Sequence, residues 1–179
     1  MEKFYFSVDD ILLQLKEVFM ELNKKRVLLG MSGGVDSSVS ALLLQKQGYE
    51  VIGATMDLWD RPDGTSGNDV AIRDAKIVCE KLGIEHVVLD FKDEFKKGVM
   101  DYFNECYANC ITPNPCVECN KKIKFGLLYK KALELGCFYV STGHYAKTEY
   151  SEKYKRWVIT KATSRKKDQT YVMYKVEPE

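Results

Sequence analysis

The sequence predicts one α/β domain, a parallel sheet with helices on both of its faces. Short apolar runs, of which residues 26–31 (RVLLGM) are the first, alternate with longer segments of helical periodicity, and this alternation is typical of a parallel sheet. The 179 residues suit a single domain with a sizeable core. Hydrophobic residues at 45% and charged residues at 30% are ordinary for a soluble globular protein.

The elements follow one another in a strand-then-helix rhythm. Gly48 and Gly83 mark the ends of the first two expected helices, and Asp69 is the expected N-cap of the second. Strands are expected at 26–31, 50–59, 85–91 and 137–143, and helices at 37–48, 69–83, 92–110 and 121–136. After Gly143 the pattern changes, and 144–150 and 156–162 predict a small β-hairpin around SEKYK.

The two ends of the chain have their own character. Residues 1–25 are amphipathic and acidic, which predicts a helical extension and does not resemble a signal peptide. No run approaches 18 apolar residues, so we expect a cytoplasmic protein without a membrane span. Residues 119–175 hold 14 Lys and Arg against 4 Asp and Glu, although the whole chain carries only +1. This basic stretch is either a polyanion-binding surface or a solvated lysine-rich face.

The loop after the first strand reads SGGVDS, residues 32–37. Ligands of parallel α/β sheets sit beyond the carboxyl ends of strands, where such a loop enters a helix. Its two glycines allow close backbone approach, and the amides at the start of the helix attract phosphate. The loop lacks the Gly-Lys-Ser/Thr of a Walker A motif. Asp36 in a phosphate cradle favours a nucleotide site with Mg²⁺.

Together with three later stretches, this loop carries a family resemblance. SGGVDS resembles the PP-loop of ATP pyrophosphatases, and TPNPCVECNKKIKFG, STGHYA and KKDQTYVMY follow in the order found in tRNA-specific 2-thiouridylases, the MnmA/TrmU family. The resemblance covers roughly residues 25–176. It implies a Rossmann-like, adenine nucleotide alpha hydrolase-like fold over 26–144, and a hairpin followed by the start of a tRNA-contacting region over 145–179.

The resemblance also assigns residues. It implies catalytic roles for Cys119 and Asp36. ATP would be bound by Gly30, Met31, Ser32, Gly33, Gly34, Val35, Asp36, Ser37, Met56 and Gly143. The tRNA would be bound by Asn114, Pro115, Cys116, His144, Lys167, Asp168 and Gln169. Without the family, the sequence favours a hydrogen-bonded structural imidazole for His144 and a core position for Met56.

Four of the six cysteines, Cys106, Cys110, Cys116 and Cys119, fall within 14 residues. Cys116 and Cys119 are expected on a loop before a basic helix, where the helix N-terminus and lysines would lower the pKa of a thiol. Cys119 matches the family nucleophile, whereas many relatives carry Asp at the position of Cys116. Zinc binding by the four cysteines, or a [4Fe–4S] cluster on Cys116 and Cys119, stays open as an alternative.

The function expected from the resemblance is ATP-dependent thiolation of the wobble uridine of tRNA to 2-thiouridine. ATP would be split to AMP and pyrophosphate with Mg²⁺. The expected partners are tRNA and a sulfur donor, with no DNA and no membrane. Two alternatives remain: a PP-loop sulfur-insertion enzyme acting on another substrate, and a non-catalytic nucleotide- or Fe–S-binding relative.

Chain length bears on the sulfur source. Family members are about twice this long and carry a second cysteine beyond the KDQ stretch, whereas this sequence has no cysteine after Cys137. Either a truncated catalytic domain or a naturally short form is expected, with the short form favoured because the α/β domain is complete. We expect good ATP binding, weak tRNA binding and dependence on an external sulfur source: inorganic sulfide, a persulfide carrier protein or cluster-bound sulfur.

Overall fold

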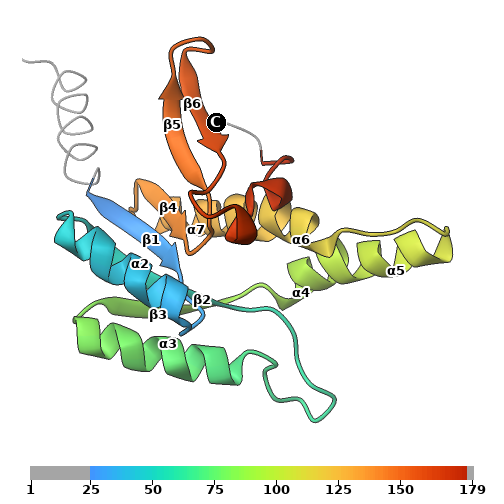
Figure 1. Cartoon of the computed structure of the whole chain (residues 1–179). Coiled ribbons are helices and arrows are strands. Elements are labelled where there is room, and N and C mark those ends of the chain that lie inside the picture. Colours follow the sequence, from blue (N-terminus) through green and yellow to red (C-terminus); the bar gives the residue numbers. More distant parts are fainter. Residues whose placement is uncertain (1–24, 177–179) are drawn as a thin grey trace, which may run out of the picture.

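The computed structural model describes residues 25–176, so the helix expected within residues 1–25 lies almost entirely outside the described part. The sheet contains β1 (Arg26–Gly30), β2 (Glu50–Asp57), β3 (Glu85–Asp90) and β4 (Tyr139–Thr142). Their order is β3-β2-β1-β4, and every neighbouring pair is parallel. The predicted parallel α/β sheet is therefore confirmed (Figure 1).

Helices cover both faces of the sheet. The side chains of β1 point alternately to one face and the other, and both sets are apolar and need cover. Val27 and Leu29 point to the face covered by α2 (Val35–Lys46) and α3 (Asp69–Leu82). Leu28 points to the opposite face, where it packs against Leu128 and Ala132 of α7 (Leu128–Glu134). All these side chains are almost completely buried, so β1 contributes to the core on both faces of the sheet.

Two helical segments each contain a π-helical stretch. One runs through α4 (Lys92–Phe95), η1 (Lys96–Met100) and α5 (Asp101–Ala108). The other runs through α6 (Pro115–Glu118), η2 (Cys119–Leu127) and α7. The sequence predicted ordinary helices here, because periodicity does not distinguish an inserted π turn. Such turns are frequent at functional sites.

The starts of the last helix and of α3 differ from expectation. The last helix begins at Pro115, six residues before the expected start at 121, because Pro115 occupies its first turn and the Asn114 side chain accepts a hydrogen bond from the Val117 amide. The cap position of α3 is Asn68, so Asp69 is the first helical residue. The Asn68 side chain instead accepts a hydrogen bond from the Leu58 amide at 2.9 Å.

A hairpin projects from the body after the sheet, as Figure 1 shows. It consists of β5 (Lys147–Ser151) and β6 (Arg156–Thr160), which pair antiparallel, so the predicted hairpin is confirmed. The chain then returns through the short 3₁₀ turns η3 (Arg165–Lys167) and η4 (Thr170–Val172). Within residues 25–176, no helix is both long and apolar enough to cross a membrane.

The returning segment packs on the helix formed by α6, η2 and α7 (residues 115–134), which carries Cys116 and Cys119 (the cysteine helix). Val172 and Met173 form a buried cluster with Val117, and the Asn120 side-chain amide donates to the Val172 carbonyl at 3.3 Å. Glu118, only 8% exposed at its side chain, pairs with Lys175 at 2.6 Å and with Lys122 at 3.0 Å. Residues 170–176 therefore fix the position of the first turn of the cysteine helix.

Glu118 should make stability depend on acid. The hydrogen bond from Lys175, followed by that from Lys122, lowers the pKa of Glu118 below its ordinary value of 4.5 in spite of burial. The unfolded chain thus takes up this proton first, so the stabilisation is complete above about pH 4.5 and is lost as pH falls through the lowered pKa. Glu118→Gln should destabilise the protein more at pH 7 than at pH 3.5 in urea unfolding. Glu152→Gln, at an exposed pair with Lys155, is the control, and equal destabilisation by Glu118→Gln at both pH values would contradict the expectation.

Candidate active site

The carboxyl ends of β1, β2 and β4 open into a pocket of about 260 Å³ beside the start of α2. This is the position at which parallel α/β sheets bind ligands. The pocket is lined by Gly30, Met31, Ser32, Asp36, Ser37, Met56, Lys124, Thr142, Gly143, His144 and Gln169. A second hollow of about 350 Å³ shares Asp36, Gly143 and His144 with it, so the two are adjoining parts of one site.

Seven of the ten residues expected to bind ATP thus line one pocket, and two of those expected to bind tRNA, His144 and Gln169, line it with them. Val35 lines the adjoining hollow. Gly33 and Gly34 shape the loop without lining either one. Met31 is 2% exposed, and its side chain lies in the core with its sulfur 3.3 Å from that of Cys79, so its main chain is what reaches the pocket.

The SGGVDS loop turns tightly into α2. The Ser37 hydroxyl donates to the Gly34 carbonyl at 3.2 Å and lies 3.4 Å from the Ser32 amide, from which it accepts. Gly34 occupies the cap position and has no side chain to bond the first-turn amides. Those amides and the positive end of the helix dipole are therefore available to an anion in the pocket.

Gly33 is the position in this loop that requires glycine. Its φ is +73°, and a Cβ there would lie 2.6 Å from the Asp74 Cβ and 2.7 Å from the Ala75 amide nitrogen. Left-handed strain and collision with α3 then act together, and Gly33→Ala should cost about 2–4 kcal/mol of unfolding free energy. Gly48→Ala is the matched control, because Gly48 has φ +85° with open space around it and should cost about 1 kcal/mol. Urea unfolding measures both, and equal losses would contradict the collision.

Asp36 lies in the first turn of α2, with its side chain exposed at the pocket. Its Oδ1 accepts a hydrogen bond of 2.7 Å from the Tyr145 hydroxyl. Gly143 lets the loop after β4 approach closely, since a Cβ there would lie 3.2 Å from the Ser37 amide nitrogen. The structure thus presents one carboxylate beside an amide-rich helix start, an arrangement suited to Mg²⁺ bridging to phosphate.

His144 is held as a neutral imidazole. Its Nδ1 lies 2.6 Å from the Thr142 hydroxyl, and its Nε2 lies 3.5 Å from the Lys124 ammonium. Burial, assisted by the charge of Lys124, lowers the pKa of His144 to about 4. Because Lys124 can only donate, Nε2 is the acceptor and Nδ1 carries the proton toward Thr142. His144 is therefore both a hydrogen-bonded imidazole and a pocket residue.

Cys119 lies one turn inside the cysteine helix, where η2 begins. It is half-buried and packs in the apolar cluster that includes Met56 and Ile123, and Met56 also lines the pocket. In a π-helix hydrogen bonds join residues five apart, so Lys124, five residues on, lies on the next turn above Cys119. Cys119 is not among the residues that line the pocket, whereas Met56 of the same apolar cluster and Lys124, whose charge acts on the thiol, do line it.

The predicted lowering of the thiol pKa is wrong for Cys119. Burial raises the pKa of Cys119, and the charge of Lys124 opposes this only in part. The sequence placed Cys119 on a loop before the helix, whereas it lies within the helix and against apolar side chains. Cys116, one turn earlier, is exposed.

The cysteines do not assemble a metal centre in the described part of the chain. Within residues 25–176 no group of three or more His, Cys, Asp or Glu side chains is placed to hold a metal ion. Cys106 is buried and Cys110 is exposed. A zinc site or a [4Fe–4S] cluster needs more thiolates than Cys116 and Cys119 supply, so the residues present do not fit either group.

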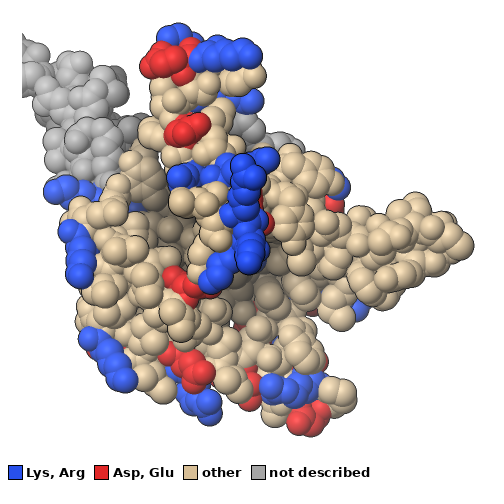
Figure 2. Space-filling model, in the orientation of Figure 1, with Lys and Arg blue, Asp and Glu red and all other residues tan. Residues whose placement is uncertain are grey.

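The KDQ stretch lies against the pocket from the side of the hairpin. Gln169 lines the pocket, and the Asp168 carboxylate accepts hydrogen bonds from the Thr170 amide and hydroxyl at 2.9 and 2.8 Å, which lower its pKa. Arg165, Lys166 and Lys167 are exposed on η3. Figure 2 shows Lys and Arg side chains gathered at the centre of this face, beside a hollow in the surface.

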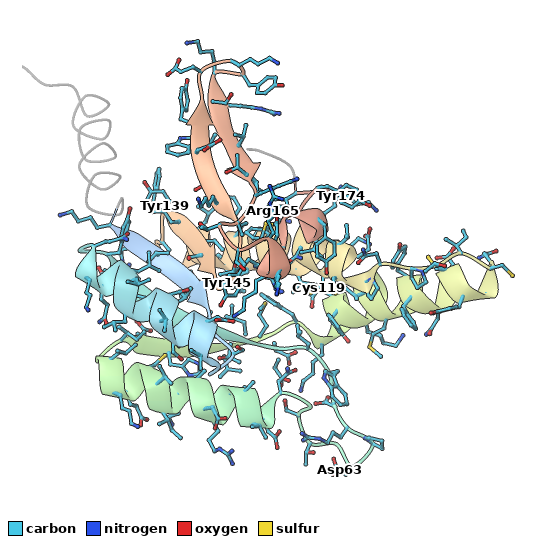
Figure 3. All side chains as sticks on the ribbon, viewed as in Figure 1. Asp63, Cys119, Tyr139, Tyr145, Arg165 and Tyr174 are labelled. Carbon is cyan, nitrogen blue, oxygen red and sulfur yellow. The ribbon has the colours of Figure 1, made fainter. Side chains whose placement is uncertain are left out.

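Three residues of the site were not predicted from the sequence: Lys124, Thr142 and Tyr145. Lys124 is one of several lysines in its helix, and only the packing of η2 directs it to the pocket. Thr142 and Tyr145 flank the pair Gly143–His144, so adjacency was the available signal. Figure 3 shows that Tyr145 and Cys119 come from different elements and lie toward the centre of the molecule, whereas Asp63 lies at its periphery.

Comparison with known proteins agrees with the motifs. The model of the tRNA methyl transferase HUP domain family matches residues 25–179. A tRNA-specific 2-thiouridylase MnmA of Clostridioides difficile is 51% identical over 165 residues, which cover 89% of this chain and 45% of the relative. The MnmA of Acetivibrio thermocellus is 47% identical, over 88% of this chain and 46% of the relative. The chain spans about half the length of these curated relatives.

Among solved structures, the U34-tRNA thiolase NcsA from Methanococcus maripaludis with its [4Fe-4S] cluster overlays with a TM-score of 0.46 and 26% identity. That overlay covers 76% of this chain and 45% of the thiolase. The resemblance to 2-thiouridylases predicted from the motifs is confirmed at the level of sequence. The chain belongs to the family of the tRNA methyl transferase HUP domain.

Proposed function

We propose that this domain uses ATP to activate a uridine of tRNA at C2 and takes part in replacing the C2 oxygen with sulfur, giving 2-thiouridine. The observation that carries the proposal is the single pocket in which the SGGVDS loop, His144, Gln169 and Lys124 converge. The cysteine helix joins this pocket through Lys124. The 2-thiouridylase names of relatives about 50% identical support the same activity.

ATP would lie with its phosphates at the start of α2. The first-turn amides and the hydroxyl of Ser32 would donate to the phosphate oxygens. Asp36 would hold Mg²⁺, which when bound neutralises phosphate charge and favours the departure of pyrophosphate. Gly30 and Gly143 line this pocket, and Met56 would offer an apolar edge for adenine.

The first step is formation of an adenylate. The C2 oxygen of the uracil attacks the α-phosphorus, pyrophosphate leaves with the bonding electron pair, and the N3 proton is released. The base has to leave its stack to reach the pocket. The C2 oxygen, a poor leaving group on its own, thereby becomes part of AMP, which is a good leaving group. Lys124 lines the same pocket, so its ammonium could stabilise negative charge on the α-phosphate.

The second step delivers sulfur. A persulfide on Cys119 attacks C2 through its terminal sulfur, and AMP leaves with the bonding pair. A second thiol then cleaves the sulfur–sulfur bond and ends as a disulfide, while the new thiocarbonyl regains a proton at N3. The sulfur donor would be a persulfide carrier or inorganic sulfide. Sulfide would attack C2 directly and needs no second thiol.

The basic stretch would position the RNA. Arg165, Lys166 and Lys167 are exposed on η3 next to the pocket and suit phosphate contacts, which orient RNA without reading its sequence. Asn114, Pro115 and Cys116, at the start of the cysteine helix, would contact the flipped base. The Asp168 bonds to Thr170 would hold this segment in shape.

Turnover of ATP to pyrophosphate, measured with and without tRNA, tests the proposal. We expect AMP and pyrophosphate in the presence of a tRNA transcript, and little of either with the same transcript carrying cytidine at the wobble position. With sulfide supplied, nucleoside mass spectrometry should detect 2-thiouridine. ADP and phosphate as the products, or equal turnover with both transcripts, would contradict it.

A further inference from the structure

Tyr145 connects the pocket with the basic segment through a continuous series of contacts. Its hydroxyl donates to the Asp36 carboxylate at 2.7 Å. The Lys167 ammonium lies 3.4 Å from the same hydroxyl oxygen and 4.9 Å from the centre of the tyrosine ring. Lys167, Tyr145 and Asp36 thus form one line of polar contacts from η3 to the first turn of α2.

The main chain of Tyr145 is fixed independently of its ring. The Tyr145 amide donates to the Gln169 side-chain oxygen at 2.9 Å, and the Gln169 amide donates to the Tyr145 carbonyl at 2.9 Å. This reciprocal pair ties the loop after β4 to the KDQ stretch. A shift of residues 167–169 would therefore move the backbone of Tyr145, and its hydroxyl would move with it.

Asp36 needs such support because its carboxylate is exposed on the first turn of a helix. An unsupported aspartate there exchanges between rotamers, and ordering it on a cation costs conformational entropy. The Tyr145 hydroxyl occupies Oδ1 and leaves Oδ2 to a cation. Groups that orient a metal-binding carboxylate in this way typically change metal affinity or activity by about 10–100-fold.

We propose that Tyr145 is a positioning residue that holds Asp36 for Mg²⁺–ATP and makes this positioning depend on Lys167. The inference rests on the nucleotide-binding part of the proposed function. A polyanion that draws Lys167 away from Tyr145 would change nucleotide affinity, and by linkage nucleotide would change affinity for the polyanion.

Calorimetric ATP binding by the full chain, with Mg²⁺ and with EDTA, tests the first half. Tyr145→Phe keeps the ring and removes the hydroxyl, so Mg²⁺–ATP binding should weaken by about tenfold while ATP binding in EDTA stays unchanged. Tyr107→Phe, an exposed tyrosine on α5, should change neither. No effect of Tyr145→Phe, or an equal loss with and without Mg²⁺, would overturn the role.

The dependence on Lys167 is tested by a double-mutant cycle. Lys167→Met should weaken Mg²⁺–ATP binding in the wild-type background by at least about threefold more than in the Tyr145→Phe background. Additive effects would overturn the coupling. Wild-type chain that binds no Mg²⁺–ATP would overturn this inference together with the proposed function. The expected binding pattern in a protein that thiolates no tRNA would overturn the proposed function alone.

Discussion

Cys119→Ser is expected to stop sulfur transfer while ATP activation continues. A serine hydroxyl cannot carry sulfane sulfur, and its far higher pKa leaves no anion to attack C2. With a persulfide carrier as the sulfur source, we expect 2-thiouridine formation below about a thousandth of the wild-type rate. Inorganic sulfide, which would attack C2 directly, should bypass the variant. Pyrophosphate release in the presence of tRNA should persist. Nucleoside mass spectrometry and a pyrophosphate assay on the same samples separate the two steps.

Cys116→Ser is the matched control, since Cys116 lies one turn earlier on the same helix and is exposed where Cys119 is half-buried. We expect a partial loss of transfer in this variant, and normal activation. Equal inactivity of the two variants, together with iron absorbance in purified protein, would instead support a cluster whose remaining ligands come from outside residues 25–176.

Asp36→Ala is expected to abolish ATP cleavage without unfolding the protein. Removing a preorganised charge at a phosphate-transfer centre costs about 10²–10³-fold in rate, and loss of the Mg²⁺ ligand adds to this. The side chain is exposed, so the unfolding free energy should change by no more than about 0.5 kcal/mol. Pyrophosphate release and urea unfolding measure the two effects.

Asp101→Ala provides the comparison for this variant. Asp101 is an exposed aspartate paired with Lys96 in the helical segment of α5, and its loss should leave turnover at the wild-type level. Retained pyrophosphate release in Asp36→Ala would contradict the assignment of Asp36. A large loss of unfolding free energy would instead show that Asp36 serves mainly to stabilise the start of α2.

The sequence predicted the fold well because its signals are local. The apolar run of β1 alternates between two buried faces. Gly48 and Gly83 stand within two residues of the ends of α2 and α3, and the segment SEKYK separates the two strands of the hairpin. The SGGVDS loop could be placed for the same reason, since a glycine-rich loop between a buried strand and a helix has one position in a parallel sheet.

What the sequence did not predict depends on contacts between distant segments. The pKa of Cys119 is set by apolar neighbours from β2 and η2, and charge counting around residues 116–124 gave the wrong sign because it ignored their burial. Tyr145 reads as an ordinary residue of STGHYA until the fold brings it to Asp36, 109 residues earlier. Lys124 could be distinguished from its neighbouring lysines only by the π-helical geometry of η2.

The contact between Glu118 and Lys175 spans 57 positions of the chain, which has a consequence for folding during synthesis. At about 5–20 residues per second, the ribosome adds Lys175 roughly 3–11 s after Glu118. Over that interval Val117 and the side-chain amide of Asn120 lack the contacts that residues 172–173 provide. The nascent cysteine helix thus reaches its final packing only once the segment proposed to hold RNA has emerged, so the two parts of the site are completed in the same event.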